Sequence, residues 1–521
     1  MKNRKPVITA GIILVVVATV IFVGALILGN FIEDELQSRQ MGTYHVQSRE
    51  AEVNVLRRGI TIRHAVIEDT AANQKFSSPE IKATGIHIFP FVFNDEIIVN
   101  KLHIQQPEIT VIRSKGKEES GQQKDASTEQ DSEIERIRIK QLEITDAAVL
   151  LLNKDSGDAD TLLSIHSGLE IRNLNIFSDH QQLKFNAHSA ENLEVRLTNG
   201  TYNLPGGLYK LQFGAINLST EQRTLNLEDL DFSSLHSKYD IAKQTGAETD
   251  WYDITLKQFN IKDISMKALL QDTAVVFGTA VLAGLDANIF RDKRPPFPDK
   301  PDSKLPMEML TGLPLPLYSD SILIKEGNVI YEEHGEESSE PGKITFNQLY
   351  ASIYNLGTIK DSTDGPTAMA VRARVMNETL LRAEFTFPDN EHTHQYRVSG
   401  SMEPVKAAVF NPMLVPAAFV KVEEGQIKGM DFDFTYDNDN SEGNLALQYE
   451  NLDIILLDKE DGSQKTIKTF LTETFVLQED NLREDKSYKE GTISFEREKK
   501  KSIFNYWWKS LFSGIKDILA F

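Results

Sequence analysis

The sequence contains no cysteine among its 521 residues. This absence excludes disulfide bonds, thiolate nucleophiles, zinc–cysteine sites and iron–sulfur clusters. Basic residues are also scarce, because 56 Lys and Arg stand against 77 Asp and Glu and the net charge is -21. Nucleic-acid binding requires a basic surface, so we expect no nucleic-acid partner. With 40% hydrophobic and 26% charged residues, the chain nevertheless has the composition of a folded protein.

Motifs of catalysis are missing as well. There is no Gly-x-x-x-x-Gly-Lys-Ser/Thr phosphate loop, no His-Glu-x-x-His zinc helix and no Gly-x-Ser-x-Gly nucleophile elbow. His392 and His394 would share one face of a strand, but no third ligand is identifiable, and a polar turn is the better interpretation. The acidic run 437–440 lacks the spacing of a calcium loop and fits a hairpin tip. We therefore expect no enzyme, no catalytic residue, no metal and no cofactor.

One uncharged apolar run has the length of a membrane helix, Val7–Leu28. About 20 apolar residues span the hydrocarbon core of a bilayer. Lys2, Arg4 and Lys5 precede the run and acidic residues follow it, which predicts a cytoplasmic N-terminus and a body on the far side of the membrane. A cleaved signal peptide is the alternative, but the run is longer than the apolar core of such peptides and lacks a clear cleavage site. Residues 1–30 are therefore predicted to form a cytoplasmic tip and a single transmembrane anchor.

Short runs of alternating apolar and polar residues dominate the chain after the anchor. Every second residue is apolar in Met430–Tyr436, and Asn444–Tyr449 continues this period. Residues two apart in a strand share one face of the sheet. Similar runs occur at 99–112, 134–144, 170–177, 209–218, 252–266 and 320–331. We therefore expect a mainly antiparallel β structure with few helices.

Turn signals separate many of these runs, for example Pro205-Gly206-Gly207 and Glu326-Gly327-Asn328. Three phrases share the form of an apolar strand, a small or polar turn and a second apolar strand: IIVNKLHIQQPEITVI, IERIRIKQLEITDAAVLLL and YSDSILIKEGNVIYEE. We interpret each phrase as a hairpin. No strict repeat period of the solenoid kind is present.

Two segments do not fit the strand pattern. Residues 114–133 contain no Val, Leu, Ile or aromatic residue and are expected to form a mobile loop. Residues 291–316 contain seven prolines, which predicts a linker between an N-terminal β half, 31–290, and a C-terminal β half, 317–496. A helix broken by two prolines is expected at Pro404–Val420.

The last segment, 497–521, combines a basic lead with an aromatic amphipathic helix. From Ile503 to Leu519 the apolar residues recur at spacings of three and four, and the polar side of this helix is expected to carry Lys509, Ser510, Ser513, Lys516 and Asp517. Indole rings and lysines suit a membrane interface. A helix that caps the end of the sheet is an equally good interpretation. The predicted interface residues are Lys499, Lys500, Lys501, Trp507, Trp508 and Phe512.

These features, in this order, resemble the AsmA-like proteins of Gram-negative envelopes, which are bacterial relatives of the chorein-type bridge-like lipid transfer proteins. The resemblance is carried by the anchor, by Ile97–Val111 with Pro107 between its strands, and by Ser319–Glu332, Val422–Tyr449 and Lys501–Leu519. The proline-rich segment and Tyr331-Glu332 are similar to Bacteroidetes-like versions of the family. All of these motifs are strand patterns rather than catalytic signatures.

The resemblance implies a long curved antiparallel β-sheet that forms a groove and is anchored in the bacterial inner membrane through residues 7–28. Its apolar face would carry phospholipids through the periplasm and support lipid homeostasis of the outer membrane. The tail would meet the outer membrane or an envelope partner. The strand period gives the candidate lipid-contact residues Ile322, Ile324, Phe432, Phe434, Leu445, Leu447 and Tyr449. The alternative is a periplasmic scaffold or tether for envelope assembly with an ordinary filled β core.

Overall fold

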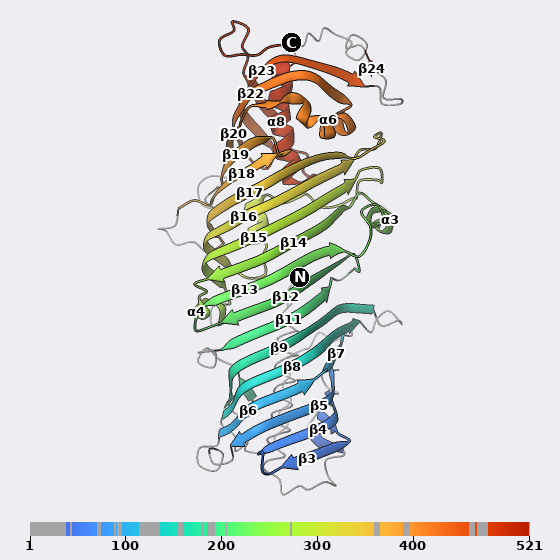
Figure 1. Ribbon diagram of the computed structural model, residues 1–521, viewed down its shortest axis with the longest axis vertical. Coiled ribbons are helices and arrows are strands. Elements are labelled where there is room, and N and C mark those ends of the chain that lie inside the picture. Colours follow the sequence, from blue (N-terminus) through green and yellow to red (C-terminus); the bar gives the residue numbers. More distant parts are fainter. Residues whose placement is uncertain are drawn as a thin grey trace. The chain divides into compact units, whose positions relative to one another are not determined.

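A computed structural model gives the structure of the chain, and its secondary structure is mainly β (Figure 1). It describes residues 38–41, 44–69, 74–87, 90, 96–113, 136–153, 160–179, 182–184, 193–204, 206–270, 273–358, 365–388, 395–457, 464–465 and 478–519. The predicted anchor, the predicted loop 114–133 and the pair His392 and His394 lie outside these ranges. The contacts divide the chain into two compact units, Met1–Leu230 and Asp231–Phe521.

The elements of the first unit whose bounds are described are strands. In chain order they are β1 (Ser38–Met41), β2 (Tyr44–Gln47), β3 (Glu50–Asn54), β4 (Gly59–Asp69), β5 (Gln74–His87), β6 (Glu96–Gln105), β7 (Glu108–Arg113), β8 (Arg136–Asn153), β9 (Asp160–Asp179), β10 (Gln182–Lys184), β11 (Glu194–Asn203) and β12 (Tyr209–Ser219), and β13 (Thr224–Ser234) contains the boundary between the units. Among the pairings described in this unit, all are antiparallel except those of β8, which runs parallel to both β6 and β7. The predicted turn is confirmed at Gly206 and Gly207, because β11 and β12 form an antiparallel hairpin around them.

The second unit adds helices to its strands. Its elements are α3 (Asp240–Thr245), β14 (Asp250–Lys262), α4 (Met266–Leu270), β15 (Val275–Asp292), α5 (Pro306–Thr311), β16 (Leu317–His334), β17 (Gly342–Gly357), β18 (Ala368–Val375), β19 (Thr379–Thr386), β20 (Tyr396–Met402), β21 (Val405–Lys406), the 3₁₀ turn η2 (Ala407–Phe410), α6 (Asn411–Ala418), β22 (Val420–Tyr436), β23 (Asn440–Leu457), β24 (Gln464–Lys465), β25 (Gly491–Glu496) and α8 (Ile503–Leu519). Strands β16 to β20 pair antiparallel in chain order, and β22 then joins β20 to β23. The parallel pair is β15 with β16.

The three phrases predicted to be hairpins are not hairpins. The phrases containing Asp146 and Glu326 each form one long strand, β8 and β16, in which the pairing register shifts close to that residue. In the third phrase β6 and β7 do not pair with each other; both pair with β5 and with β8. Asp146, Glu326 and Gln106 all have a positive φ, as expected at β-bulges, where an extra residue bends a strand without ending it.

The proline-rich segment lies within the second unit rather than at the division between the units. It begins at Arg291, whose strand β15 continues to Asp292, and it includes α5. Because β15 and β16 are parallel, the connection must return across one face of the sheet, as crossovers between parallel strands do. The broken helix predicted at Pro404–Val420 is confirmed as η2 followed by α6, with Pro416 inside α6.

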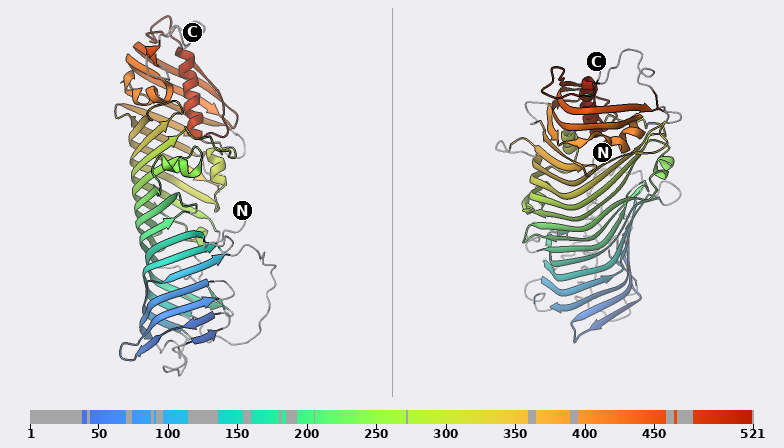
Figure 2. Two further views of the ribbon diagram at one scale, coloured as in Figure 1. Left: turned by 90° about the vertical axis from the view of Figure 1, so that its right-hand side faces the viewer. Right: turned by 45° about the horizontal axis from the view of Figure 1, so that its top comes forward.

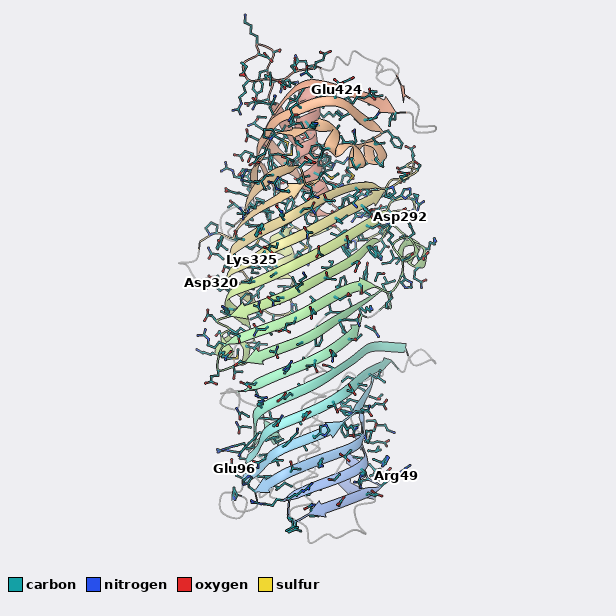
Figure 3. The ribbon with its side chains drawn as sticks, viewed as in Figure 1. Arg49, Glu96, Asp292, Asp320, Lys325 and Glu424 are labelled. Atoms are coloured by element: carbon teal, nitrogen blue, oxygen red, sulfur yellow. The ribbon has the colours of Figure 1, made fainter. Side chains whose placement is uncertain are left out.

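Charged residues lie at strand ends in both units. Glu96 begins β6 in the first unit, and Asp292 ends β15 in the second (Figure 3). Apolar residues occupy the middle of the strands and form two buried clusters, one confined to the first unit and one to the C-terminal part of the second.

Candidate functional site: an apolar sheet face and the helix that covers part of it

Two continuous rows of apolar or small residues cross the sheet of the second unit. Residues that are partners in the pairing register lie side by side on the same face of a sheet. The first row, followed from strand to strand, is Ile261, Ala280, Ile322, Ile353, Met369, Phe385, Val398, Phe434, Gly443 and Ile493. The second is Phe259, Leu282, Ile324, Ala351, Val371, Ala383, Gly400, Phe432, Leu445 and Gly491. We name the face that carries them the apolar face.

The seven candidate lipid-contact residues divide into two groups on this sheet. Phe432, Phe434, Leu445, Leu447 and Tyr449 are buried in one cluster, with Phe434 1% and Leu445 0% exposed. Ile322 and Ile324 lie in the same two rows but are only half-buried. The sequence period therefore selects residues of one face of the sheet. Their burial differs along the rows, because the candidates on β22 and β23 are buried and those on β16 are half-buried.

The helix α8 supplies the cover at the C-terminal end, as Figure 2 shows. It approaches the sheet closely because small residues face the strands. Ser510 is fully buried and its hydroxyl lies 2.7 Å from that of Ser441. A Cβ added to Gly514 would lie 2.9 Å from the Cβ of Leu445 and 3.0 Å from Cγ1 of Ile493. The prediction that Ser510 lies on the polar outer side of the helix is therefore wrong.

Side chains of α8 also satisfy the outer edge of β25. The backbone N–H of Thr492 donates to Asp517 Oδ2 at 2.8 Å, and that of Ser494 donates to the Ser513 hydroxyl at 3.1 Å. The hydrogen bond from Thr492 lowers the pKa of Asp517, and Lys489 adds to this effect. An edge strand presents unpaired polar groups, and here the helix occupies some of them. The alternative that the tail caps the end of the sheet is thus what the structure contains.

The two tryptophans of α8 face opposite sides. The ring of Trp507 packs against Phe385, a member of the first row, at a centroid distance of 4.8 Å. Trp508 is 50% exposed and stacks on Phe512, which is also exposed, and Phe504 continues this outer surface at 72% exposed. We name Phe504, Trp508 and Phe512, which are spaced four residues apart, the outer aromatic stripe. The single stripe expected from the sequence is in fact two apolar surfaces, one against the sheet and one outward.

The three lysines predicted to meet lipid all form ion pairs with acidic side chains. Lys499 Nζ lies 2.6 Å from Asp439, Lys500 lies 2.7 Å from Asp299, and Lys501 lies 3.8 Å from Glu248. Asp439 belongs to the tip that joins β22 to β23, which confirms that 437–440 is a hairpin tip. The basic lead therefore fastens α8 to the hairpin tip, to the proline-rich segment and to the start of β14.

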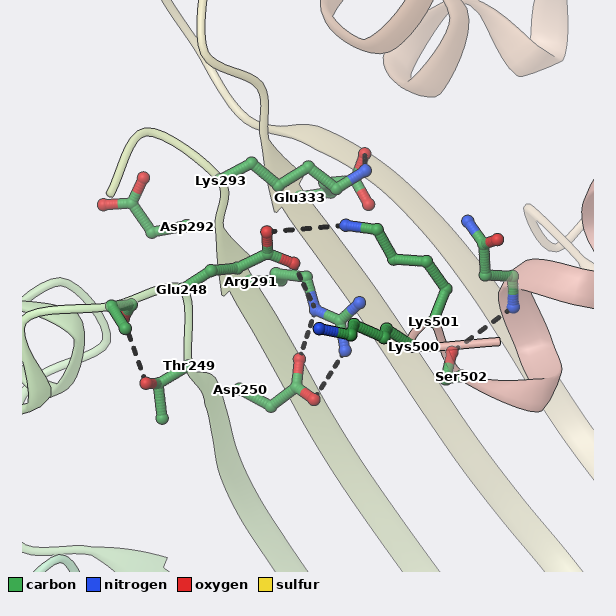
Figure 4. A network of polar contacts seen from close by, with 12 residues as sticks. Glu248, Thr249, Asp250, Arg291, Asp292, Lys293, Glu333, Lys500, Lys501 and Ser502 are labelled. Atoms are coloured by element: carbon green, nitrogen blue, oxygen red, sulfur yellow. Dashed lines mark hydrogen bonds and ion pairs between the residues drawn. The ribbon is translucent and has the colours of Figure 1, made fainter. Parts of the chain in front are cut away.

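Glu248 takes part in a polar network at the border of the sheet (Figure 4). The guanidinium of Arg291 donates to both oxygens of Asp250, at 2.5 and 2.6 Å, and its Nε lies 3.6 Å from Glu248. Burial lowers the pKa of Arg291, but the hydrogen bonds and charge of Asp250 outweigh burial and raise it overall. Since these groups are paired, they can be buried as ions, and the network holds the basic lead of α8 in place.

Rows of the same kind cross the first unit. One row is Ile62, Ile81, Ile104, Ile144, Leu169, Leu197 and Ile216, and its neighbour is Ile60, Ala83, Leu102, Leu142, Ile171, Val195 and Leu218. Members on β4 to β8 are buried in one cluster, whereas Leu197 and Ile216 are half-buried. None of the seven candidate lipid-contact residues lies in this unit, although the alternation in 99–112 and 134–144 is the sequence signal for these rows.

Among the described residues, no helix is long and apolar enough to cross a membrane. In the same part of the chain, no group of three or more His, Asp or Glu side chains could hold a metal ion. Comparison with models of protein families and with curated proteins finds no match for this sequence. The function is therefore argued from the apolar rows and from the surfaces around them.

Proposed function

We propose that the chain carries phospholipids, whose acyl chains lie along the apolar face, while residues 7–28 tether it in the inner membrane as in the AsmA-like proteins that its sequence resembles. The observation that supports this proposal is the pair of rows in the second unit. They are unbroken by any charged residue over ten strands, and Ile322, Ile324 and Ile353 are only half-buried. A filled core would bury such residues completely.

The dimensions of the rows suit an acyl chain. Ten strands at ~4.8 Å spacing give a length of about 43 Å, whereas one leaflet of a ~30 Å hydrocarbon core is about 15 Å deep. Each methylene that leaves water is stabilised by about 0.8 kcal/mol. A lipid can therefore move from strand to strand with its tails kept out of water, and no residue has to perform chemistry.

The proposal extends to the C-terminal end. The outer aromatic stripe of α8 presents three large rings that are 40% to 72% exposed. Exposed aromatic rings suit a headgroup layer. We infer that this stripe contacts the outer membrane or an envelope partner, where lipid would be delivered.

The test is site-specific photocrosslinking to lipid. A photoreactive amino acid is placed at Ile322 or Ile324 in the full-length chain, and at Leu323 as the matched control, because Leu323 alternates with them and points to the opposite face. After irradiation in cells with an envelope, lipid adducts are expected at the two isoleucines and not at Leu323. Equal labelling at all three positions, or no adduct at any, would contradict the proposal.

The second candidate function is that of a periplasmic scaffold or tether. It is favoured by the two fully buried clusters, which show the filling of an ordinary β core. Lipid mass spectrometry on the washed, purified chain separates the two functions. Several phospholipids per chain support carriage, and a folded chain without lipid supports the scaffold.

A further inference from the structure

The hairpin that joins β3 to β4 exposes large apolar side chains at its tip. Val55 is 81% exposed and Leu56 is 97% exposed, and Val53 on the adjoining strand is also exposed. The turn is nevertheless well formed, because the backbone N–H of Arg57 donates to Asn54 Oδ1 at 2.9 Å and that of Arg58 donates to the carbonyl of Val55 at 3.2 Å. The turn therefore holds the Leu56 side chain in solvent rather than packing it against the protein.

Two unpaired arginines follow these apolar residues. Arg57 and Arg58 are exposed, and neither forms an ion pair with any residue in the ranges that the structure describes. By contrast Arg63, farther along β4, lies 2.8 Å from Glu50, 3.7 Å from Glu52 and 3.8 Å from Glu80. In a chain of net charge -21, the tip is thus a local cationic and apolar surface. Arginine binds phosphate groups through two parallel hydrogen bonds.

The tip lies within reach of the predicted anchor. Ser38 pairs with Gln47, which pairs with Val66, whereas Asn54 at the tip pairs with Gly59. On β4, Val66 and Gly59 are seven residues apart, which corresponds to about 23 Å. Residues 29–37 between the apolar run and Ser38 can span up to ~30 Å in any conformation. The surface of the membrane that holds the anchor is therefore accessible to the tip.

We propose that the β3–β4 tip docks into that membrane, with Val55 and Leu56 among the acyl chains and Arg57 and Arg58 on the phosphates of anionic lipids. The proposal deepens the proposed function and rests on its membrane anchor. It assigns a role to an edge of the first unit: the docked tip holds the end of the apolar rows that begin at Ile60 and Ile62 against the bilayer that supplies the lipid. Apolar insertion combined with arginine–phosphate contact is the usual physics of interfacial binding.

The absence of cysteine makes a direct test possible. Leu56→Cys is labelled with an environment-sensitive fluorophore, and the full-length chain is reconstituted into vesicles of phosphatidylcholine with phosphatidylglycerol that carry a quencher within the bilayer. Gln222→Cys is the matched control, because Gln222 lies exposed in the turn that follows β12. We expect the label at position 56 to be quenched at least fivefold more than the label at position 222. Equal and weak quenching at both positions would overturn the proposal.

Two further outcomes are informative. Replacing Arg57 and Arg58 by Gln should reduce the quenching at position 56 at least threefold and remove its dependence on the anionic lipid. A label at position 56 that is shielded in native membranes but not in protein-free vesicles would instead show that the tip binds a protein, which contradicts the proposal. Lipid adducts at Ile322 are scored separately, so a failure of docking and a failure of lipid carriage are distinguishable.

Discussion

Small residues on α8 decide how closely the helix covers the apolar face. At Gly514 and Ser510 the absence of bulk lets α8 approach the strands, so Leu445 and Ile493 are covered by the helix. Tyr449 lies in the same cluster, fully buried, and its hydroxyl has no hydrogen-bond partner among the described residues. A buried hydroxyl without a partner destabilises the fold, whereas a phenyl ring in its place does not.

The first prediction follows from the pKa of Tyr449, which burial, with a smaller contribution from Asp480, raises to about 12. An unfolded tyrosine ionises near pH 10. Above about pH 10 the folded state keeps a proton on Tyr449 that the unfolded state releases. The ionisation of Tyr449 therefore leaves the free energy of unfolding unchanged below about pH 10 and lowers it as the pH rises toward 12. Tyr449→Phe should raise the free energy of unfolding by about 1 kcal/mol at pH 7 and should make its decline between pH 9 and 11.5 shallower. Urea unfolding across this pH range measures both effects.

Tyr354→Phe is the control for this prediction, because Tyr354 is 48% exposed. It should leave the stability at pH 7 unchanged. If Tyr449→Phe loses stability at pH 7, its hydroxyl has a partner and the argument is wrong.

The elements show which features the sequence could predict and which it could not. The strands and α8 follow from spacing alone, because their apolar periods of two and of three to four residues are regular. The sequence predicts turns at Asp146 and Glu326, where the structure has bulges, because a polar residue that interrupts an apolar run is typical of both. The two sides of α8 could not be assigned from the sequence, because a helix with apolar residues on two faces does not specify which face packs.

The second prediction compares the stability of alanine variants at the two adjacent tryptophans of α8. Trp507→Ala removes a ring that packs on Phe385 and should cost about 2 kcal/mol or more of the free energy of unfolding. Trp508→Ala removes an exposed ring and should change stability by no more than about 0.5 kcal/mol. Urea unfolding of the two variants checks this difference.

The same pair tests the role of the outer aromatic stripe. With the full-length chain reconstituted in donor vesicles, Trp508→Ala should reduce the capture of protein-free acceptor vesicles while the fold stays intact. If capture is unchanged by Trp508→Ala and also by a triple change that includes Phe504 and Phe512, the stripe does not bind membranes.

At the scale of the whole molecule, both units follow one plan. Each contains apolar rows across a mainly antiparallel sheet, and each contains a place where the chain returns to lie parallel to an earlier strand. In the second unit the connection is the segment after Asp292, which belongs to a segment that the sequence excludes from strands. A parallel pair needs a crossover of a dozen or more residues, so a long non-strand segment in a β chain indicates such a pair. The sequence alone does not show the parallel pair, because a proline-rich segment is equally typical of a linker between two β halves.

The last prediction compares the same substitution, to aspartate, at a buried and at a half-buried position of the second row. Ile324 and Phe432 both belong to the second row, but only Phe432 is buried, in the cluster that residues of α8 also join. Phe432→Asp places an unpaired charge in a filled core and should cost about 3 kcal/mol or more. Ile324→Asp leaves its carboxylate in contact with water, so it should fold with a loss of about 1 kcal/mol while the amount of co-purified phospholipid falls. Leu323→Asp on the opposite face is the control and should affect neither. Urea unfolding and lipid mass spectrometry on the three full-length variants measure these effects. If the row conducts lipid, Ile324→Asp lowers the amount of co-purified phospholipid and the protein stays folded. If the row only fills a core, Ile324→Asp and Phe432→Asp both unfold the protein.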